Sequence, residues 1–236
     1  SRLPEFTVEV HAEANDYHAD EIVEVASPDY SAKWKLDPAA ELGVVFAGYG
    51  EGVGHLLSAQ GRATAAVFAG SLGVANGGRK LEDLKALVVG SGGGQERGVS
   101  AERIGTWGKN GGTVVVLTQA TGAQMGFLPR SGEFDYMGWE DDPGHRENAS
   151  HLASISPAFN GFDHADVTVM TDGRFARIPK DAKVLLRRKT TGEPELIEYA
   201  YGSGKVIAGG LFTDYAYKNG ALSADEKLLM KNLAAY

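Results

Sequence analysis

Short apolar runs that end in glycine alternate with longer polar segments along most of this 236-residue chain. The clearest example lies between Lys85 and Gln124. There, apolar residues 86–89 lead into the glycine-rich stretch 90–94, and a second apolar run follows at 114–117. Apolar runs of this length are typical of buried strands, and the segment between them is long enough for a crossover helix. The pattern therefore predicts a right-handed strand–helix–strand unit with parallel strands.

The same pattern predicts the elements around this unit. Segment 99–109 is expected to form the crossover helix, and Ser223 with Glu226 has the spacing of a capping box that starts a C-terminal helix. Further strands are predicted at 43–46, 64–68, 167–170, 183–186, 195–199 and 205–208, the last two joined by a hairpin at 201–204. Strands that alternate with helices and end in an antiparallel group predict an α/β fold. We expect a three-layer sandwich with a mostly parallel, flavodoxin-like sheet.

Residues 1–40 differ from the rest of the chain. Alternating apolar and polar residues at 6–11 and the short apolar run 22–25 predict two strands. Two isolated strands are only marginally stable, so we favour a short N-terminal β extension over the end of an upstream β module. The main α/β domain is then expected to span residues 41–236.

Composition narrows the classes of partner. The formal net charge of −8 argues against nucleic acid or an anionic membrane as the main partner. The chain has no cysteine, which excludes disulfides, thiolate metal sites and cysteine nucleophiles. No apolar run approaches the roughly 20 residues that a membrane span requires. The 32 glycines cluster after apolar runs, which indicates an architectural role.

The opening unit carries a resemblance to a known superfold. The run KALVVGSGGG, a helix, and then NGGTVVVLTQATGAQ resemble the core of the class I glutamine amidotransferase-like superfold. That superfold also includes ThuA-like proteins and the trimerisation domain of some β-galactosidases. The closing segments ELIEYAYGSGKVIAGGLFTDY and ADEKLLMKNLAAY, and residues 156–162, are similar to parts of the non-amidotransferase relatives. The resemblance covers residues 42–236 and implies the same α/β fold.

The catalytic pattern of that superfold is absent where the resemblance places it. In active amidotransferases the elbow reads Cys-x-Gly-x-Gln, and here residues 120–124 put Ala120 in the place of the nucleophile while keeping Gln124. The late His-x-Glu falls near residues 213–215, where no histidine is present. Acyl transfer needs a nucleophile within hydrogen-bond reach of a base. The resemblance therefore implies the fold without glutamine amidotransferase activity.

Two glycine loops and one serine have both a functional and a structural interpretation. Loop 90–94 can present backbone N–H groups to an anion or a carbonyl, as a binding nest. Loop 48–54 enters a helix but lacks the spacing of dinucleotide and P-loop motifs, so we favour a tight strand–helix turn. Ser91 lies outside a G-x-S-x-G motif and is interpreted as a loop serine.

Residues 125–162 combine aromatic, acidic and histidine side chains without a period, so a functional loop or a lid is expected there. Three functional interpretations are open: a divalent cation site, a glycoside acid/base pair, and a surface that contacts a sugar or a protein. The structural alternative is a solvated loop whose Tyr136 and Trp139 side chains pack against the domain. No recognised ligand spacing supports the cation site. If the chain is an enzyme, the candidate catalytic residues are Glu133, Asp135, Glu140, Asp142, His145 and His151.

We therefore expect a non-catalytic amidotransferase-like domain that serves interaction, assembly or carbohydrate contact within a larger protein. A hydrolase acting on a glycan is the alternative. The expected partner is a protein or a glycan, with homo-oligomerisation as a further option, and no cofactor or metal is expected. The resemblance to carbohydrate-associated relatives implies an extracytoplasmic location. The residues predicted to form the binding site are Gly92, Gly93, Gln95, Ala120, Gln124, Tyr136, Trp139 and Asp214.

Overall fold

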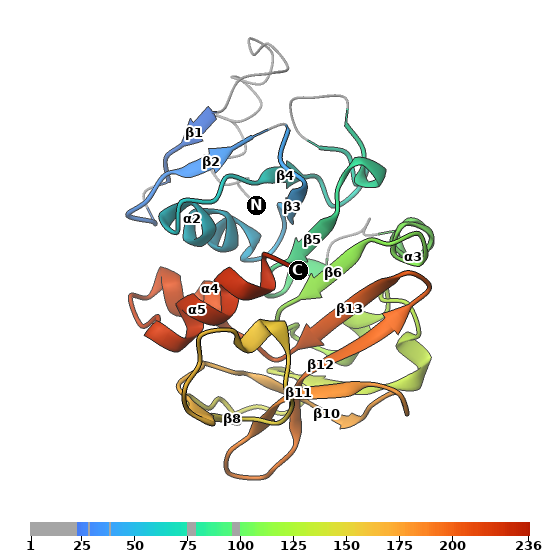
Figure 1. Ribbon diagram of the computed structural model, residues 1–236, viewed down its shortest axis with the longest axis vertical. Coiled ribbons are helices and arrows are strands. Elements are labelled where there is room, and N and C mark those ends of the chain that lie inside the picture. The colour runs from blue at the N-terminus through green and yellow to red at the C-terminus, as the bar shows by residue number, and fades with distance from the viewer. Residues whose placement is uncertain (1–22, 28, 38, 75–78, 96–99) are drawn as a thin grey trace.

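The computed structural model describes residues 23–236 apart from residues 28, 38, 75–78 and 96–99 (Figure 1). The strand predicted at 6–11 lies outside the described residues. Within the described part of the chain, no helix combines the length and the apolar composition that crossing a bilayer requires.

The central sheet has nine strands among the described residues, in the order β4-β3-β5-β6-β13-β12-β11-β8-β9. Neighbouring strands run parallel from β4 to β13 and antiparallel from β13 to β9. The predicted α/β fold is therefore confirmed, with a sheet that is parallel in its first half and antiparallel in the rest. The strands are β3 (Leu42–Val45), β4 (Ala65–Val67), β5 (Ala86–Val89), β6 (Thr113–Val116), β8 (Ser150–Leu152), β9 (Asp166–Val167), β11 (Lys183–Arg188), β12 (Pro194–Tyr201) and β13 (Gly204–Gly209).

Both faces of the sheet are covered (Figure 1). One face packs against α2 (Gly50–Ala59), α4 (Thr213–Lys218) and α5 (Ala224–Leu233). The other packs against α3 (Ala101–Lys109) and a two-stranded sheet of β7 (Asp135–Gly138) and β10 (Gly173–Arg177).

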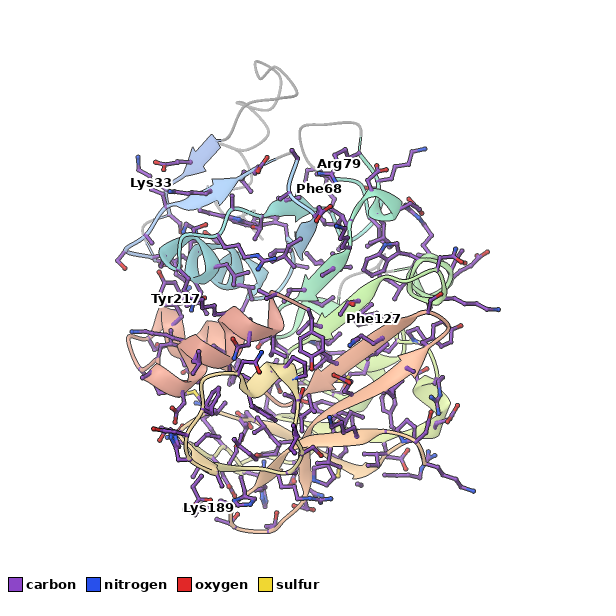
Figure 2. All side chains as sticks on the ribbon, in the orientation of Figure 1. Lys33, Phe68, Arg79, Phe127, Lys189 and Tyr217 are labelled. Atoms are coloured by element: carbon purple, nitrogen blue, oxygen red, sulfur yellow. The ribbon has the colours of Figure 1, made fainter. Side chains whose placement is uncertain are left out.

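Each parallel strand contributes side chains to both cores. Along β5, for example, Val88 enters the core under α2 and α5, whereas Val89 enters the core under α3. Figure 2 shows side chains filling both layers, with Tyr217 on one side of the sheet and Phe127 on the other. A strand covered on both faces needs an unbroken apolar run, which is why β5 is buried at all four positions.

Residues near the N-terminus contribute directly to this core. β1 (Val23–Val25) lies within the strand predicted at 22–25, and it pairs antiparallel with β2 (Trp34–Leu36), which the sequence pattern did not predict. The Trp34 side chain is fully buried between α2 and the sheet. Its indole Nε1 donates to the Thr64 hydroxyl at 2.7 Å, so the large ring is also hydrogen-bonded.

Helix α2 begins earlier than predicted. The sequence pattern placed a loop at 48–54, whereas the helix already starts at Gly50. Glycine is a poor helix former, but here it allows close approach: a Cβ at Gly50 would overlap the Val45 carbonyl, and one at Gly54 would overlap the Trp34 ring. The tight turn is therefore shorter than predicted, and Gly48 adopts its left-handed conformation with φ +56°.

The segment 125–162 contains more regular structure than predicted. It includes β7, β8 and the 3-10 helices η4 (Ser131–Glu133) and η5 (Pro157–Phe159). β7 pairs with β10, and β8 pairs with β11 and β9, so these two stretches of the segment are packed parts of the fold. Strands of three or four residues with mixed burial leave no period in the sequence, which is why they were not predicted.

The C-terminal helix begins as predicted. The Ser223 hydroxyl accepts from the Glu226 N–H, and the Glu226 carboxylate accepts from the Ser223 N–H, both at 3.0 Å. This capping box satisfies donors at the start of α5 that no helical partner reaches. Leu229 and Leu233 then anchor the helix in the core.

Gly54→Ala should destabilise the fold. A Cβ at this position collides with the Trp34 ring, and such overpacking typically costs about 1–3 kcal/mol, which exceeds the gain of about 1 kcal/mol in helix propensity. Urea denaturation followed by circular dichroism measures the loss. Gly70→Ala is the matched control, because no heavy atom lies within 4 Å of its Cβ, and it should stay within about 0.5 kcal/mol of the parent. Equal stability of the two variants would contradict the packing described for Trp34.

Candidate functional site

The parallel strands direct their carboxyl ends to one edge of the sheet, which we call the carboxyl edge. There, β3, β5, β6 and β13 continue into residues 47–49, 90–93, 118–120 and 210–215. Backbone hydrogen bonds join these segments, such as Thr118 N–H to the Leu211 carbonyl at 2.9 Å. In open α/β sheets, ligands bind beyond the carboxyl ends of the strands. We therefore expect a ligand-binding site in this fold to lie at this edge.

A buried hydrogen-bond cluster, the Ser91–Asp214 clamp, joins two of these segments. The Asp214 carboxylate accepts from the Ser91 hydroxyl at 2.6 Å, from the Ser91 N–H at 2.7 Å and from the Tyr215 N–H at 2.9 Å. Ser91 and Asp214 are both fully buried. The clamp fixes the end of β5 against the start of α4. Ser91 lies in the turn after β5, as its interpretation as a loop serine expected, and the bonds to Asp214 give it a structural role there.

The clamp does not form a nucleophilic centre. Among the described residues, no hydrogen bond joins Ser91 to a histidine, and its hydroxyl proton is directed at Asp214. Burial raises the pKa of Asp214 to about 6, while the hydrogen bonds from Ser91 and Tyr215 act in the opposite direction. A serine next to a carboxylate without an intervening base lacks the group that would accept its proton during acyl transfer.

The elbow that follows β6 is closed. Ala120 is fully buried, and its N–H donates to the Gln124 side-chain oxygen at 2.8 Å. Its carbonyl accepts from the Glu140 N–H at 2.9 Å, and Gly138 of β7 packs so closely that a Cβ there would overlap the Gln119 and Ala120 carbonyl oxygens. The place that the resemblance assigns to the nucleophile is therefore occupied by alanine and covered by β7.

The glycine loop after β5 is also bonded internally. The Gln119 side chain reaches back to it, since its Nε2 donates to the Gly90 carbonyl at 3.0 Å. This corrects the binding-nest interpretation, because the N–H groups on which it relied are already occupied. Three of them donate within the chain at 2.8 to 3.0 Å: Gly92 to the Thr118 carbonyl, Gly93 to the Gly90 carbonyl and Gly94 to Oε1 of Gln119.

Next to the clamp, four aromatic residues form what we call the aromatic edge cluster: Tyr49, Trp139, Phe212 and Tyr215. Trp139 stacks on Phe212 with ring centroids 5.4 Å apart, and Phe212 stacks on Tyr215 at 4.5 Å. Tyr49 meets both Phe212 and Tyr215 edge-on at 6.0 Å. Phe212 is buried, whereas the other three side chains are half-buried. The carboxyl edge thus presents parts of three aromatic rings to solvent.

Arg146 packs over this cluster. Its Cζ lies 5.1 Å from the centroid of the Phe212 ring and 4.9 Å from that of Tyr215. Its Nε donates to the Asp172 carboxylate at 3.0 Å. The side chain of Arg146 is 44% exposed and that of Asp172 only 7%. Cation–π contact and a charge-assisted hydrogen bond therefore hold a guanidinium group in a fixed position at the solvent boundary.

The other predicted binding residues lie deeper or beside this surface. Tyr136 is buried, and its hydroxyl bonds to the Thr118 hydroxyl at 2.7 Å and accepts from the Gln119 N–H at 3.3 Å. Gln95 is the last residue of the 3-10 helix η2 (Gly93–Gln95). Trp139 is the predicted binding residue that brings a half-buried aromatic ring to the carboxyl edge.

Two of the predicted acidic residues lie at the start of β7 and are paired with arginines. Glu133 lies 2.7 Å from Arg130, and Asp135 lies 2.8 Å from Arg177. Hydrogen bonds from these arginines lower the pKa of both carboxyls. A general acid in glycoside hydrolysis needs a raised pKa, so this arrangement does not favour that role.

The remaining predicted residues lie beyond β7. Asp142 bonds to Arg174 at 2.7 Å and faces His145 at 3.1 Å, and the bond from Arg174 lowers its pKa. Glu140 is exposed next to Trp139, and His151 is on β8, where it pairs with Asp166. The structure therefore brings Asp142 and His145 together. In the described part of the chain, no three histidine, aspartate or glutamate side chains are placed to hold a metal ion.

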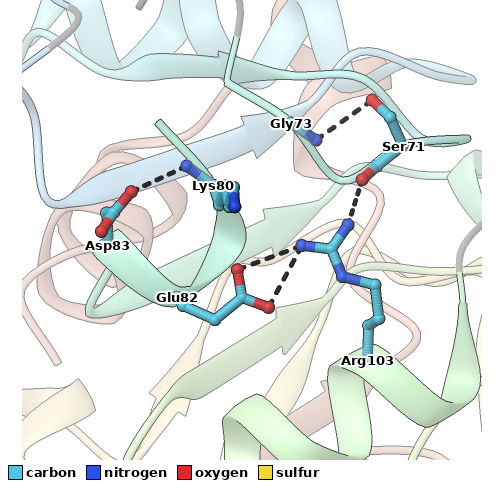
Figure 3. A pocket seen from close by; sticks show the side chains of 6 residues that line it. All are labelled: Ser71, Gly73, Lys80, Glu82, Asp83 and Arg103. Atoms are coloured by element: carbon cyan, nitrogen blue, oxygen red, sulfur yellow. Dashed lines mark hydrogen bonds and ion pairs between the residues drawn. The ribbon is translucent and has the colours of Figure 1, made fainter. Parts of the chain in front are cut away.

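A cavity of about 640 Å³ lies beside α3, but none of the predicted site residues lines it (Figure 3). Two of its charged side chains, Arg103 and Glu82, bond to each other at 3.1 Å, and Arg103 also donates to the Ser71 carbonyl. The backbone N–H of Lys80 donates to the Asp83 carboxylate at 2.8 Å. The contacts of Arg103 join α3 to the segment before β5.

Comparison with known proteins shows the fold but not a family. No protein-family model matches the chain, and no curated protein matches its sequence. Among solved structures, a GMP synthase-like protein from Thermoplasma acidophilum aligns with 82% of this chain and 91% of its own, with a TM-score of 0.56 and 13% identity. The chain therefore shares the α/β fold of that protein. At this identity the likeness concerns the fold alone.

Two β-galactosidases show weaker likenesses. The enzyme from Rahnella sp. R3 has a TM-score of 0.49 at 13% identity and aligns with 80% of this chain. The enzyme from Bacillus circulans sp. alkalophilus has a TM-score of 0.48 at 15% identity and aligns with 81%. The alignments span 33% and 31% of the two enzymes, so this chain corresponds to about a third of their length.

Sequence reasoning missed most of the site because its contacts are distant along the chain. Ser91 and Asp214 are 123 residues apart, and neither lies in a local motif. Phe212 and Tyr215 did carry a signal, since two aromatic residues flank the position where the resemblance places the His-x-Glu pattern. Arg146 carried none, because its partners belong to other elements.

Asp214→Asn should change the pH dependence of stability. The pKa of Asp214 is about 6 in the folded chain against 3.8 as its ordinary value, so the folded state binds more protons between these values. The contribution of Asp214 to the free energy of unfolding therefore falls as pH rises through this window, by about 2 kcal/mol from about pH 4 to pH 7. Urea denaturation across this range should show the parent losing stability relative to the variant.

Asp181→Asn is the control for this experiment. Hydrogen bonding to Arg130 lowers the pKa of the exposed Asp181 carboxyl, so its contribution to stability grows with pH, opposite in sign to that of Asp214. A difference between the parent and Asp214→Asn that does not vary with pH would contradict the assignment for Asp214.

Ala120→Cys tests whether the elbow is closed. The chain has no native cysteine, so the variant carries a single thiol. Because position 120 is fully buried, we expect a thiol reagent such as Ellman's reagent to modify it at least about tenfold more slowly than Ala123→Cys, whose position is exposed. Equal rates in two variants with the parent's circular dichroism spectrum would show that the elbow opens to solvent.

Proposed function

We propose that this chain is a non-catalytic amidotransferase-like domain that contacts a carbohydrate within a larger protein. The observation that carries the proposal is the aromatic edge cluster, with three half-buried aromatic residues, at the edge where this fold would hold a reaction centre. The contact surface would comprise Tyr49, Trp139 and Tyr215, together with Arg146.

The closed elbow supports the absence of amidotransferase chemistry. The nucleophile position is a buried alanine, Ala120, and the position of the late His-x-Glu pattern holds Asp214, which is committed to Ser91. The hydrolase alternative is less well supported, because Glu133, Asp135 and Asp142 are all bonded to arginines that lower their pKa values.

The composition of the cluster supports carbohydrate contact. Tryptophan and tyrosine rings combine an apolar face, suited to the C–H face of a sugar, with a polar tip that can reach water. Stacking on Phe212 already restricts Trp139 and Tyr215, so little further freedom is lost when a ligand binds. A protein segment would suit the same rings, and it is the competing ligand in the test below.

The proposal extends to an extracytoplasmic location, which rests on the resemblance of the sequence to carbohydrate-associated relatives. Fractionation of the producing cells, followed by immunodetection of the natural full-length protein, would test this location. Recovery with the cytoplasmic fraction alone would overturn it.

Trp139→Ala should weaken carbohydrate binding by about tenfold or more, because it removes the stacking face of the cluster. Binding of the parent to immobilised glycans, followed by calorimetry with the glycans it retains, measures the effect. Tyr201→Ala is the matched control, since Tyr201 is a half-buried aromatic residue at the β12–β13 hairpin, at the amino end of β13. A parent protein that retains no glycan, or equal losses in the two variants, would overturn the proposal.

A further inference from the structure

The positive charge of Arg146, which packs over the aromatic edge cluster, is balanced by a neighbouring carboxylate. Arg146 and Asp172 form an ion pair at 3.0 Å, and the carboxylate is almost fully covered. The guanidinium is therefore a neutralised donor group, whose exposed part can still donate hydrogen bonds. Such a group suits an uncharged acceptor, such as a hydroxyl oxygen, at least as well as an anion.

The neighbouring side chains add negative charge. Segment 139–146 contains Glu140, Asp141 and Asp142, of which Asp142 is balanced by Arg174 at 2.7 Å. Glu140 and Asp141 are both exposed, and the whole chain carries a net charge of −8. Glu140 directly follows Trp139 in the chain, and charges closer than about 8 Å are only partly screened at physiological salt, so its carboxylate disfavours a carboxylated, sulfated or phosphorylated ligand at this ring.

The position of Trp139 adds a geometric constraint. One face of its ring is stacked on Phe212 at an interplanar angle of 11°, and its edge lies over the glycine loop, where a Cβ at Gly92 would be 3.5 Å away. The indole is thus held flat against the protein, and Arg146, from the same segment, packs over the same Phe212 ring. A flat apolar ring beside a fixed donor matches the two faces of a pyranose, namely its C–H face and its hydroxyl rim.

We propose that the ligand of the aromatic edge cluster is an uncharged saccharide, which stacks on Trp139 and accepts hydrogen bonds from Arg146. This inference rests on the proposed carbohydrate contact and names the class of sugar. Acidic saccharides share the stacking face but carry carboxylates, so we expect them to bind more weakly beside the exposed Glu140 and Asp141.

Tryptophan fluorescence provides a direct measurement. The chain has three tryptophans, of which Trp34 and Trp107 are buried, so a ligand-induced change reports on Trp139. The probes are neutral gluco-, manno- and galacto-oligosaccharides and oligogalacturonates of the same length. We expect saturable changes with at least one neutral series, at least about tenfold tighter than with the uronates, and little change in affinity as salt is raised.

Arg146→Gln tests the donor. The variant loses a hydrogen-bond donor that faces the ligand, so the affinity for the neutral saccharide should fall by at least about tenfold. Arg177→Gln is the matched control. Arg177 is also paired with an aspartate, but it lies on β10 opposite the start of β7, away from Trp139. The affinity of this variant for the saccharide should stay within about twofold of the parent.

The outcomes separate this inference from the function on which it rests. Tighter binding of uronates than of neutral saccharides would overturn the inference and leave carbohydrate contact standing. Binding of neither class would overturn both. Equal affinities of Arg146→Gln and Arg177→Gln for a neutral saccharide would remove Arg146 from the binding site.

Discussion

The buried carboxylate of Asp214 holds the carboxyl edge together. It accepts hydrogen bonds from both the hydroxyl and the N–H of Ser91, so the end of β5 cannot shift relative to α4. Phe212 and Tyr215 flank Asp214 in sequence and stack on each other, and their rings in turn support Trp139 and Arg146. Burying a carboxylate is costly, as its raised pKa reflects, but three hydrogen bonds offset much of that cost. A polar interaction inside the protein thereby positions an aromatic surface at its edge.

Close backbone approach is the second constraint, and it explains many of the glycines. At Gly138 any side chain would overlap the elbow carbonyls, at Gly50 it would overlap β3, and at Gly54 it would overlap the Trp34 ring. These contacts bring β7 onto the elbow and α2 onto the sheet without intervening side chains. Residues that resemble a ligand-binding glycine motif in sequence therefore act here as packing positions, and the elbow closes because β7 can lie directly on it.

The fold was predictable from sequence to the extent that its elements carry a period. β3, β5 and β6 are continuous apolar runs covered on both faces, and the capping box at Ser223 marks the start of α5, so these elements were found. Short strands such as β2, β7 and β10 were missed, because three to five residues with mixed burial carry no detectable period. The site was less predictable still. Trp139 and Asp214 were identified individually, but their partners Phe212 and Ser91 are distant in sequence, and only the folded chain brings them together.

Recovering the reaction typical of this fold would require several independent changes. A cysteine at position 120 would supply a nucleophile, but no histidine is bonded at Ser91 or Asp214 within the described part of the chain to act as its base. The N–H groups of Gly92, Gly93 and Gly94, which would have to stabilise an oxyanion, already donate within the chain, and the Ala120 N–H donates to Gln124. Each missing oxyanion donor costs about 3 kcal/mol of transition-state stabilisation, so a nucleophile alone would have little effect. A contact surface needs none of these groups, only fixed rings and a fixed donor, and the Ser91–Asp214 clamp with the Arg146–Asp172 pair provides both.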